Sequence, residues 1–236
     1  MEPVRNDRRE VGLDEWLAGS QQRSGNSSRP SVTLCYAQSL DGSIALRRGE
    51  RLALSGPESH RLTHQLRAKH DAILVGIGTV ISDDPQLNVR LAEGSDPQIV
   101  VLDSNLRTPI SARLLKGRPH IFCVASASRE AQENLEGAGA ILERQTDMVE
   151  TRVSLPVMLA RLREIDIRSL MVEGGGEIIS SFLSENLIDR VIITIAPEFV
   201  GGYKILGQPF EKMLMLKNEK VEKYGKDFIL WADVEK

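Results

Sequence analysis

Two glycine-containing segments, each directly after an apolar run, are the parts of this sequence best suited to bind a ligand. The first covers residues 75–80, Val-Gly-Ile-Gly-Thr-Val, and is followed by Asp83 and Arg90. Glycines let a backbone approach a ligand closely, and the hydroxyl of Thr79 can donate to a phosphate oxygen. A tight turn also needs glycine, so this segment taken alone is compatible with a purely structural role.

The second segment covers residues 171–177, Met-Val-Glu-Gly-Gly-Gly-Glu, where an apolar run leads through three glycines into a predicted helix. The N–H groups at such a helix start, together with the helix dipole, form an anion site. Glu173, at the end of the strand, would face the same crevice. The glycines are contiguous and no Gly-Lys-Ser/Thr follows, so this is neither a Walker loop nor a Gly-x-Gly-x-x-Gly fingerprint. Close packing of helix on sheet is the structural alternative.

Metal and nucleophile chemistry finds little support. His60 and His64 share one face of a predicted helix, as in zinc proteases, but Arg61 stands where the general-base Glu should be. An ordinary amphipathic helix explains the pair. The chain has no Gly-x-Ser-x-Gly nucleophile elbow. Cys35 and Cys123 sit in apolar runs and are predicted to be small buried hydrophobic residues. We therefore predict no metal site.

The elements that position these residues alternate between short β-rich runs and amphipathic helical segments. A cap at Ser55, with Glu58 three residues later, predicts a helix that runs to about residue 69. The predicted strands are 32–37, 44–46, 72–75, 98–102, 121–124, 170–172 and 191–195, and the other predicted helices are 128–136, 154–165 and 177–185. Residues 213–222 and 227–234 flank Tyr224-Gly225-Lys226 and predict a terminal hairpin.

This alternation predicts an α/β fold with a mixed, mostly parallel sheet, helices on both faces and a C-terminal hairpin. Ligands of such sheets bind beyond the carboxyl ends of the strands. Both glycine segments follow strands directly, so we expect the binding site there.

Composition and charge exclude several classes of function. The chain has 236 residues, 41% of them hydrophobic and 27% charged, and its net charge of −3 argues against a broad nucleic-acid-binding surface. No apolar stretch approaches the roughly 20 residues needed to cross a bilayer. The N-terminus lacks the apolar core of a signal peptide and is rich in acidic residues, unlike a transit peptide. We predict a cytoplasmic protein.

Residues 1–29 differ in character from the rest. Residues 20–29 are polar, rich in Gly and Ser and without periodicity. We therefore predict a flexible N-terminal extension over 1–29, which contributes little to the core, and a single domain over 30–236. The alternative is that residues 11–17 form one or two amphipathic turns that dock on a partner subunit.

Four segments, in order and spacing, resemble the reductases of riboflavin biosynthesis. Residues 37–45, Ala-Gln-Ser-Leu-Asp-Gly-Ser-Ile-Ala, are similar to the opening strand and turn of that family. The most specific segment covers residues 66–90, LRAKHDAILVGIGTVISDDPQLNVR. Residues 172–175, VEGG, and 197–202, PEFVGG, complete the set. The resemblance covers roughly residues 30–235.

The resemblance implies a three-layer, dihydrofolate-reductase-like domain that uses NADPH and is usually a homodimer. The family reduces the ribosyl C1′ of a pyrimidine ribosylamine 5′-phosphate and gives the ribitylamino product. A ribosylamine opens to an imine, whose C1′ accepts a hydride. The site must therefore hold both reacting carbons close together and exclude water.

The resemblance also implies the site residues. Thr79, Asp83, Ser104, Gly174, Gly175, Gly176, Glu177 and Ile178 match cofactor-binding positions, and Arg67, Leu87, Arg90 and Glu173 match substrate-binding positions. Arginine suits the substrate phosphate because its fork can bind two oxygens at once. Glu173 is the first candidate for a catalytic polar group and Asp41 the second, although Asp-Gly is commonly only a turn. Arg107 is the candidate for the 2′-phosphate of the cofactor.

Two features depart from the bifunctional bacterial members. Ala53 stands where they carry a Trp near the cofactor, so the resemblance does not define that side of the nicotinamide pocket or the substrate preference. The zinc deaminase motif, His-x-Glu with Pro-Cys-x-x-Cys, is absent, as in stand-alone relatives that reduce before deamination. The 2,5-diamino pyrimidine is therefore favoured over the 5-amino-dione. The alternatives are a reductase of the same fold acting on another heterocycle and a non-catalytic nucleotide-binding protein.

Overall fold

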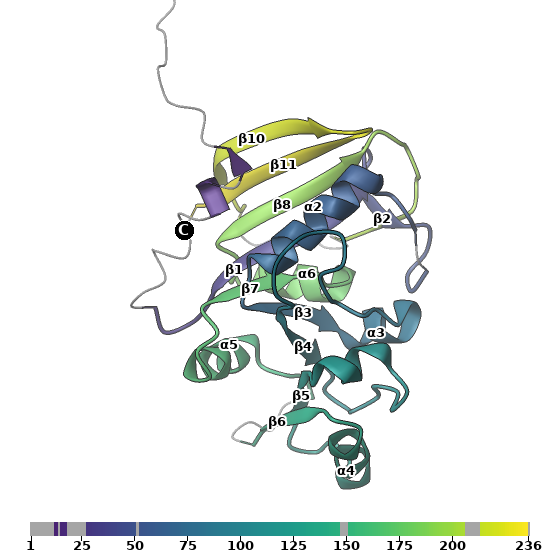
Figure 1. Ribbon diagram of the computed structural model, residues 1–236, viewed down its shortest axis with the longest axis vertical. Helices are drawn as coiled ribbons and strands as arrows, with labels where there is room; N and C mark the ends of the chain where they lie inside the picture. The colour runs from purple at the N-terminus through teal and green to yellow at the C-terminus, as the bar shows by residue number, and fades with distance from the viewer. Residues whose placement is uncertain are drawn as a thin grey trace, which may run out of the picture.

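A nine-stranded sheet forms the centre of the molecule. The computed structural model describes residues 12–13, 15–17, 27–50, 52–146, 151–205 and 213–235. The strand order is β10-β11-β8-β1-β7-β3-β4-β5-β6 (Figure 1). The strands from β8 to β6 run parallel, whereas β11 is antiparallel to both β8 and β10. This is the mixed, mostly parallel sheet that the sequence predicts.

The strands of this sheet are β1 Ser31–Ser39, β3 Ala72–Gly76, β4 Gln98–Leu102, β5 His120–Val124, β6 Ile141–Gln145, β7 Ser169–Val172, β8 Arg190–Ala196, β10 Leu216–Tyr224 and β11 Asp227–Val234. Two short strands, β2 Ser43–Ala45 and β9 Tyr203–Lys204, pair with each other. The helices are α2 Pro57–Ala68, α3 Ile77–Asp83, α4 Arg129–Gly137, α5 Leu155–Glu164 and α6 Gly176–Ser184, with a 3-10 turn η1 at Arg113–Gly117.

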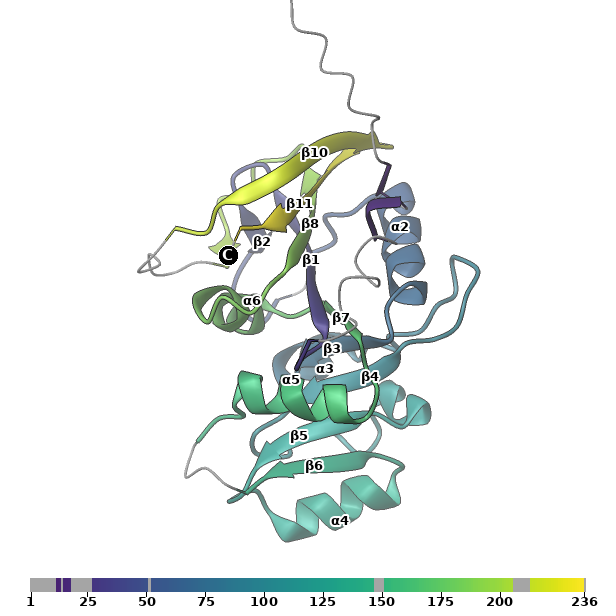
Figure 2. The same cartoon turned by 90° about the vertical axis from the view of Figure 1, so that its left-hand side faces the viewer.

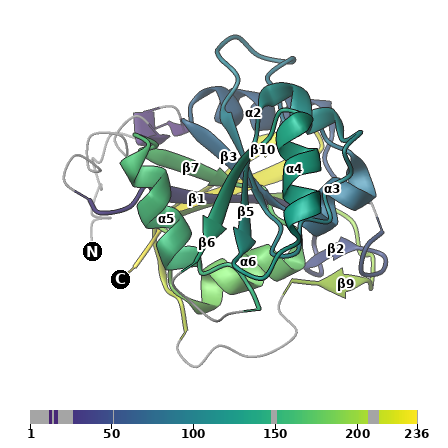
Figure 3. The same cartoon turned by 90° about the horizontal axis from the view of Figure 1, so that it is seen from below.

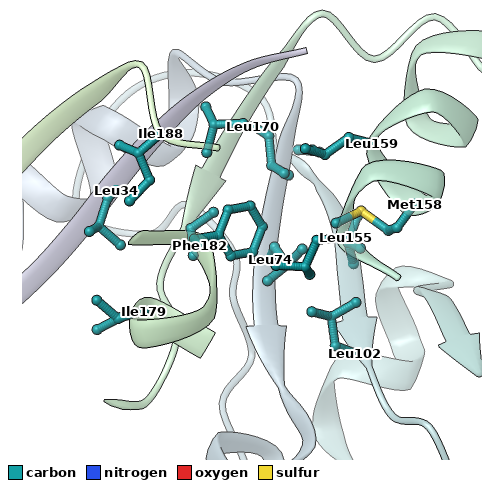
Figure 4. Close-up of a cluster of buried hydrophobic side chains, with 14 of the residues drawn as sticks. Leu34, Leu74, Leu102, Leu155, Met158, Leu159, Leu170, Ile179, Phe182 and Ile188 are labelled. Atoms are coloured by element: carbon teal, nitrogen blue, oxygen red, sulfur yellow. The ribbon is translucent and has the colours of Figure 1, made fainter. Parts of the chain in front are cut away.

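Helices cover both faces of the sheet, so the fold has three layers (Figures 2 and 3). Successive residues of a strand point to opposite faces. In β3, Leu74 packs against α5 and α6, where Phe182 and Met158 are fully buried (Figure 4). Ile73 and Val75 of the same strand pack on the other face against α3, η1 and α4. The core is therefore split by the sheet into two apolar layers.

The start of α2 differs from its predicted cap. Gly56, not Ser55, is the N-cap residue, and no side chain of the cap bonds the helix. Instead the buried carboxylate of Asp227, at the beginning of β11, accepts from the N–H of Gly56 at 2.7 Å and from the hydroxyl of Ser59 at 2.7 Å. In α4, by contrast, the N-cap is local: the hydroxyl of Ser128 accepts from the N–H of Ala131. A long-range contact thus replaces the local cap of α2.

The structure contains several elements that the sequence does not predict. These are α3, which begins at the first glycine segment, the 3-10 turn η1, and the strands β6 and β9. Every residue of β6 is half-buried, because it is an edge strand with little apolar contrast between its faces. The other predicted strands and helices are confirmed within a few residues of their bounds, and Cys35 and Cys123 are buried free thiols. Among the described residues, no helix is long and apolar enough to span a membrane.

The described part of the N-terminal extension packs on the sheet. Leu13, Trp16 and Leu17 are buried in one cluster with α2 and with Trp231 of β11. The guanidinium of Arg190 lies over Trp16, 4.3 Å from the ring centroid. The three side chains are spaced as one face of a helical turn, which is why they can be buried together. The prediction that the extension contributes little to the core does not hold for these residues; the division of the chain at residue 30 stays a prediction.

Candidate functional site

A cleft of about 1360 Å³ opens at the carboxyl ends of β3, β4 and β7. This volume exceeds the roughly 300–1,000 Å³ of a pocket for one small ligand, so the cleft has room for two. It is lined by Arg67, Thr79, Asp83, Leu87, Arg90, Ser104, Glu173, Gly174, Gly175, Gly176, Glu177 and Ile178. The structure therefore brings all of the predicted binding residues to one place, while their individual roles stay predictions.

The two glycine segments meet because β3 and β7 are neighbouring parallel strands. The N–H of Glu173 donates to the carbonyl of Leu74 at 2.9 Å, which aligns the ends of the two strands. A Cβ placed on Gly175 would lie 3.4 Å from the hydroxyl oxygen of Thr79. The starts of α3 and α6 are therefore adjacent, as expected for a crevice at the edge of the sheet.

The three glycines before α6 differ in what surrounds them. A Cβ on Gly174 would lie 2.5 Å from Ile178, and one on Gly176 would lie 2.9 Å from the ring of Tyr203, so both glycines permit close packing. Gly175 meets no such obstacle and is the N-cap residue of α6, with no side chain bonded to the helix start. The packing and anion-site interpretations thus apply to different glycines, and Gly175 is the one that leaves the first N–H groups of α6 open.

A bidentate ion pair lies on the substrate side of the cleft. Nε and Nη2 of Arg67 donate to the two carboxylate oxygens of Glu173 at 2.8 and 2.7 Å. Nη1 of Arg67 donates to the carbonyl of Asn88 at 3.1 Å. Burial opposes the charge on Arg67, but the bonds and the charge of Glu173 prevail and raise its pKa. Arg67 is therefore a fixed cation, and Glu173 is a carboxylate whose orientation is already set.

Leu87 and Arg90 belong to the loop that follows α3. Leu87 is buried in the same apolar cluster as Ile73 and has a φ of 55°, in the left-handed region that a bulky residue rarely adopts. Arg90 is exposed, and its Nη1 donates to the side-chain oxygen of Asn88 at 3.1 Å. Leu87 thus anchors the loop, and Arg90 extends from it into the cleft.

Three other predicted cofactor residues, Ser104, Glu177 and Ile178, contact other parts of the protein. The Ser104 hydroxyl accepts from the N–H of Val153 at 3.2 Å, which ties the loop after β4 to the segment before α5. Glu177 forms an ion pair with Arg48 at the mouth of the cleft. Ile178 fills the space left by Gly76 and Gly174. These residues shape the cleft whether or not they contact a ligand.

The second catalytic candidate, Asp41, is not among the described residues that line the cleft. Its carboxylate accepts from the hydroxyls of Ser39 at 2.5 Å and Ser43 at 2.9 Å, and from the N–H groups of Val200 and Gly201 at 3.0 Å each. These bonds, the Ser39 bond foremost, lower the pKa of Asp41. The structure thus places Asp41 between the β1–β2 turn and the loop after β8, and its catalytic role stays a prediction.

From the sequence, His64 is a candidate only for metal binding, but the structure places it in the cleft. Its Nδ1 accepts from the N–H of Arg90 at 3.2 Å. The sequence does contain a signal for this position: His64 precedes Arg67 by three residues, which places both side chains on the same face of α2. Among the described residues, no three His, Cys, Asp or Glu side chains are grouped so as to hold a metal ion.

Known proteins resemble this chain over most of its length. The RibD C-terminal domain family matches residues 30–230. The 2,5-diamino-6-ribosylamino-4(3H)-pyrimidinone 5′-phosphate reductase of Archaeoglobus fulgidus is 38% identical over 218 residues, which cover 86% of this chain and 98% of that protein. The riboflavin biosynthesis protein RibD of Aquifex aeolicus is 34% identical over 210 residues, and the matched part spans 57% of that protein.

Solved structures of other proteins also resemble this chain. The riboflavin biosynthesis reductase Rib7 of Saccharomyces cerevisiae superposes with a TM-score of 0.71 at 28% identity, over 89% of this chain and 92% of Rib7. Dihydrofolate reductase from Enterococcus faecalis, at 13% identity and a TM-score of 0.52, over 87% of this chain and 97% of that protein, shares the fold. The fold is thus dihydrofolate-reductase-like, and the chain belongs to the RibD C-terminal domain family of riboflavin-biosynthesis reductases.

Proposed function

We propose that this chain uses NADPH to reduce the ribosyl group of 2,5-diamino-6-ribosylamino-4(3H)-pyrimidinone 5′-phosphate to the ribityl group, the substrate in the name of the Archaeoglobus relative. One observation carries the proposal: the open start of α6 and the Arg67–Glu173 pair line the same cleft. The first feature suits the pyrophosphate of a dinucleotide, and the second suits a small polar substrate.

The reaction needs positioning more than it needs a nucleophile. The ribosylamine opens to an imine, and its C1′ is the carbon to be reduced. The cofactor, when bound, supplies the hydride, and water supplies the proton that the imine nitrogen takes up. Arg67 and Arg90 would bind the substrate phosphate. The carboxylate of Glu173, oriented by Arg67, would accept hydrogen bonds from the amino groups of the pyrimidine or from a ribose hydroxyl. Holding the substrate in place and excluding water supplies the rate enhancement.

The residues around α6 fit a nicotinamide dinucleotide. Gly175 leaves backbone N–H groups open, and Thr79 adds a hydroxyl beside it. Arg107, after β4, and Arg152, before α5, both line the cleft and are exposed. The Ser104–Val153 hydrogen bond ties their two loops together. Two arginines at this point would bind the 2′-phosphate that distinguishes NADPH from NADH, which supports NADPH as the cofactor.

The test is an assay of the purified chain with NADPH or NADH and with each of two pyrimidines, the 2,5-diamino-pyrimidinone and the 5-amino-uracil ribosylamine 5′-phosphates. We expect loss of reduced nicotinamide absorbance with NADPH and the diamino substrate, and at least about tenfold tighter binding of NADPH than of NADH, the effect of roughly one charged hydrogen bond. No turnover with either pyrimidine would contradict the proposal. Equal dissociation constants for the two cofactors would contradict NADPH specificity.

A second candidate is a reductase of the same fold that acts on another heterocycle. Ala53 favours it, since this small, exposed residue lines the cleft where the bifunctional relatives are expected to carry a Trp. A wider pocket on that side could admit a larger substrate. Turnover of a bulkier heterocycle, with none of either riboflavin precursor, would support this candidate.

We also propose that the chain forms a homodimer in the cytoplasm. Val221 of β10 and Phe228 of β11 are 58% and 39% exposed. By the register of the two strands they lie on the same face, the one that α6 covers farther along the sheet. An uncovered apolar face beside an edge strand suits a second copy of the chain.

A further inference from the structure

His64 is a buried polar residue in the substrate half of the cleft. Its residue exposure is 3%, and it lies one helical turn before Arg67 on α2. Its Nδ1 accepts from the backbone N–H of Arg90 at 3.2 Å. A buried imidazole with a backbone partner connects α2 to the Arg90 loop, which has no helix or strand of its own.

Three side chains from outside this stretch hold the backbone of residues 88–90. Arg67 donates to the carbonyl of Asn88 at 3.1 Å, and Asp96 accepts from the N–H of Val89 at 2.7 Å. His64 supplies the third bond, to the N–H of Arg90. Asp96 lies in the same exposed loop, so the two bonds from α2 are the ones that tie residues 88–90 to the rigid part of the fold.

Burial and two neighbouring cations lower the pKa of His64. Burial lowers its pKa first, and the guanidinium groups of Arg67 on α2 and Arg90 on the loop lower it further. Glu173, after β7, and the carbonyl of Asn88 act in the opposite direction without reversing the shift. A neutral imidazole has one acceptor nitrogen, and here the bond from Arg90 occupies it.

We propose that His64 is a positioning residue of the substrate-phosphate site, whose unprotonated Nδ1 holds the backbone of Arg90 and so fixes the arginine that binds the phosphate. The identity of the ligand rests on the proposed function; the bond that His64 makes does not. A histidine that only fills space would be replaceable by leucine, whereas a histidine that accepts the Arg90 N–H needs an acceptor at the position of Nδ1.

The same bond makes phosphate binding sensitive to acid. Protonated imidazole has no acceptor, so the bond to the Arg90 N–H is lost and a third positive charge is added between Arg67 and Arg90. Because the pKa of His64 is lowered, the neutral form persists at neutral pH and is lost only as the pH falls below the usual value for histidine. We therefore expect the KM for the phosphorylated substrate to rise in acid.

Two variants separate the effect of the hydrogen-bond acceptor of His64 from the effect of its side-chain volume. His64→Asn places an amide oxygen near the position of Nδ1 and cannot be protonated, whereas His64→Leu keeps the bulk without an acceptor. We expect His64→Leu to raise the KM for the phosphorylated pyrimidine about tenfold, with a smaller change in kcat and an unchanged Kd for NADPH. His64→Asn should stay within about threefold of the wild-type KM.

The pH profile provides a readout that a space-filling role would not change. Between about pH 7.5 and about pH 5 the KM of the wild type should rise more steeply than that of His64→Asn. Titration of the substrate phosphate affects both proteins equally, so the difference between the two profiles belongs to His64. Parallel profiles would overturn the proposal, and so would a His64→Leu variant with the wild-type KM.

Hydrogen–deuterium exchange of the free protein tests the inference without any turnover. His64→Leu should speed exchange in peptides that cover residues 87–91, and His64→Asn should not. If the wild type reduces neither pyrimidine, the proposed function fails while this comparison still decides whether His64 holds the loop. Equal exchange in all three proteins would overturn the inference. If His64→Leu does not fold, the exchange and the pH profile of His64→Asn decide it.

Discussion

Arg67 and Arg90 reach the same cleft with different degrees of restraint. Arg67 is held by both oxygens of Glu173 and by the carbonyl of Asn88, so its position is set before a ligand arrives. Arg90 is exposed, and its backbone, not its guanidinium, is anchored to α2. If both arginines bind the phosphate, as proposed, we infer that Arg67 sets its orientation and that Arg90 contributes most of the binding energy.

Arg90→Ala should therefore weaken substrate binding specifically. A charge-assisted hydrogen bond is worth roughly 1.5–3 kcal/mol, so the KM should rise about ten- to a hundredfold. The value of kcat should change much less than kcat/KM, since the contact persists in the transition state. The variant should also lose discrimination against the dephosphorylated analogue, with an unchanged Kd for NADPH as the control. An unaltered KM with continued rejection of the analogue would mean that phosphate binds elsewhere.

Asp41→Asn tests whether Asp41 is scaffold or catalyst. Four donors face its carboxylate, and an amide would turn an NH₂ group toward some of them. We expect a lower Tm and, for the molecules that stay folded, unchanged kcat and KM. Because the pKa of Asp41 is lowered, its stabilising contribution is present at neutral pH and is lost as the pH falls into the acid range where carboxylates protonate. The Tm of the wild type should thus fall more steeply in acid than that of the variant. A selective loss of kcat would return Asp41 to the catalytic machinery.

At the scale of elements, the start of α6 depends on three glycines with separate reasons to be glycine. The contiguous glycines predict a close approach of the backbone, but they do not distinguish an approach to a ligand from an approach to another part of the protein. Only the packed structure distinguishes Gly174 and Gly176, where an added side chain would collide with Ile178 or Tyr203, from Gly175, where it would not. The same limit applies to the cap of α2, because its partner, Asp227, lies 168 residues after Ser59 along the chain.

Gly174→Ala and Gly175→Val should fail in different ways. The methyl group of Gly174→Ala would meet Ile178 at 2.5 Å and force the α6 helix away from the sheet, so we expect a clear loss of Tm. Gly175 has an ordinary backbone conformation, so Gly175→Val should fold, yet its side chain would obstruct the open N–H groups. We expect its Kd for NADPH to rise at least about tenfold. Unchanged cofactor affinity in folded Gly175→Val would leave packing as the role of all three glycines.

Trp16→Ala tests the packing of the N-terminal segment. The indole is 9% exposed and covers Arg190, so truncation removes a large apolar contact and a cation–π interaction. We expect the free energy of unfolding to drop by about 3 kcal/mol, measured by chemical denaturation. Arg61→Ala, at an exposed position of α2, is the control and should change little. Equal stability of Trp16→Ala and the wild type would show that the segment does not contribute to the core.

At the scale of the whole molecule, the fold class was predictable because the strands β3, β4, β5 and β7 are short apolar runs between amphipathic helices. The position of the site followed from topology, since both glycine segments end parallel strands. The sequence does not reveal which apolar surfaces of the fold are covered by another part of the molecule. Leu13 and Trp16 stand in a short amphipathic segment, and their burial depends on an apolar face formed by α2 and β11. Local patterns carry no information on such long-range partners.

The apolar face at β10 and β11 is a further exposed surface, and its partner is proposed to be a second copy. If so, the wild type should have twice the chain mass of 26.2 kDa in light scattering after size exclusion. Val221→Lys places a charge on that face and should shift the protein toward the monomer, since two copies of the charge would be buried against each other.

Val221→Lys should keep the wild-type Tm when the monomer is compared at low concentration, because Val221 is 58% exposed and contributes little to the core. Ile110→Lys is the matched control: Ile110 is 66% exposed, but it lies in the loop after β4, in the other half of the sheet. It should leave the mass unchanged. If the dimer persists in Val221→Lys but is lost in Ile110→Lys, the interface lies in the other half of the sheet. If the wild type is monomeric, the proposal of a homodimer is wrong.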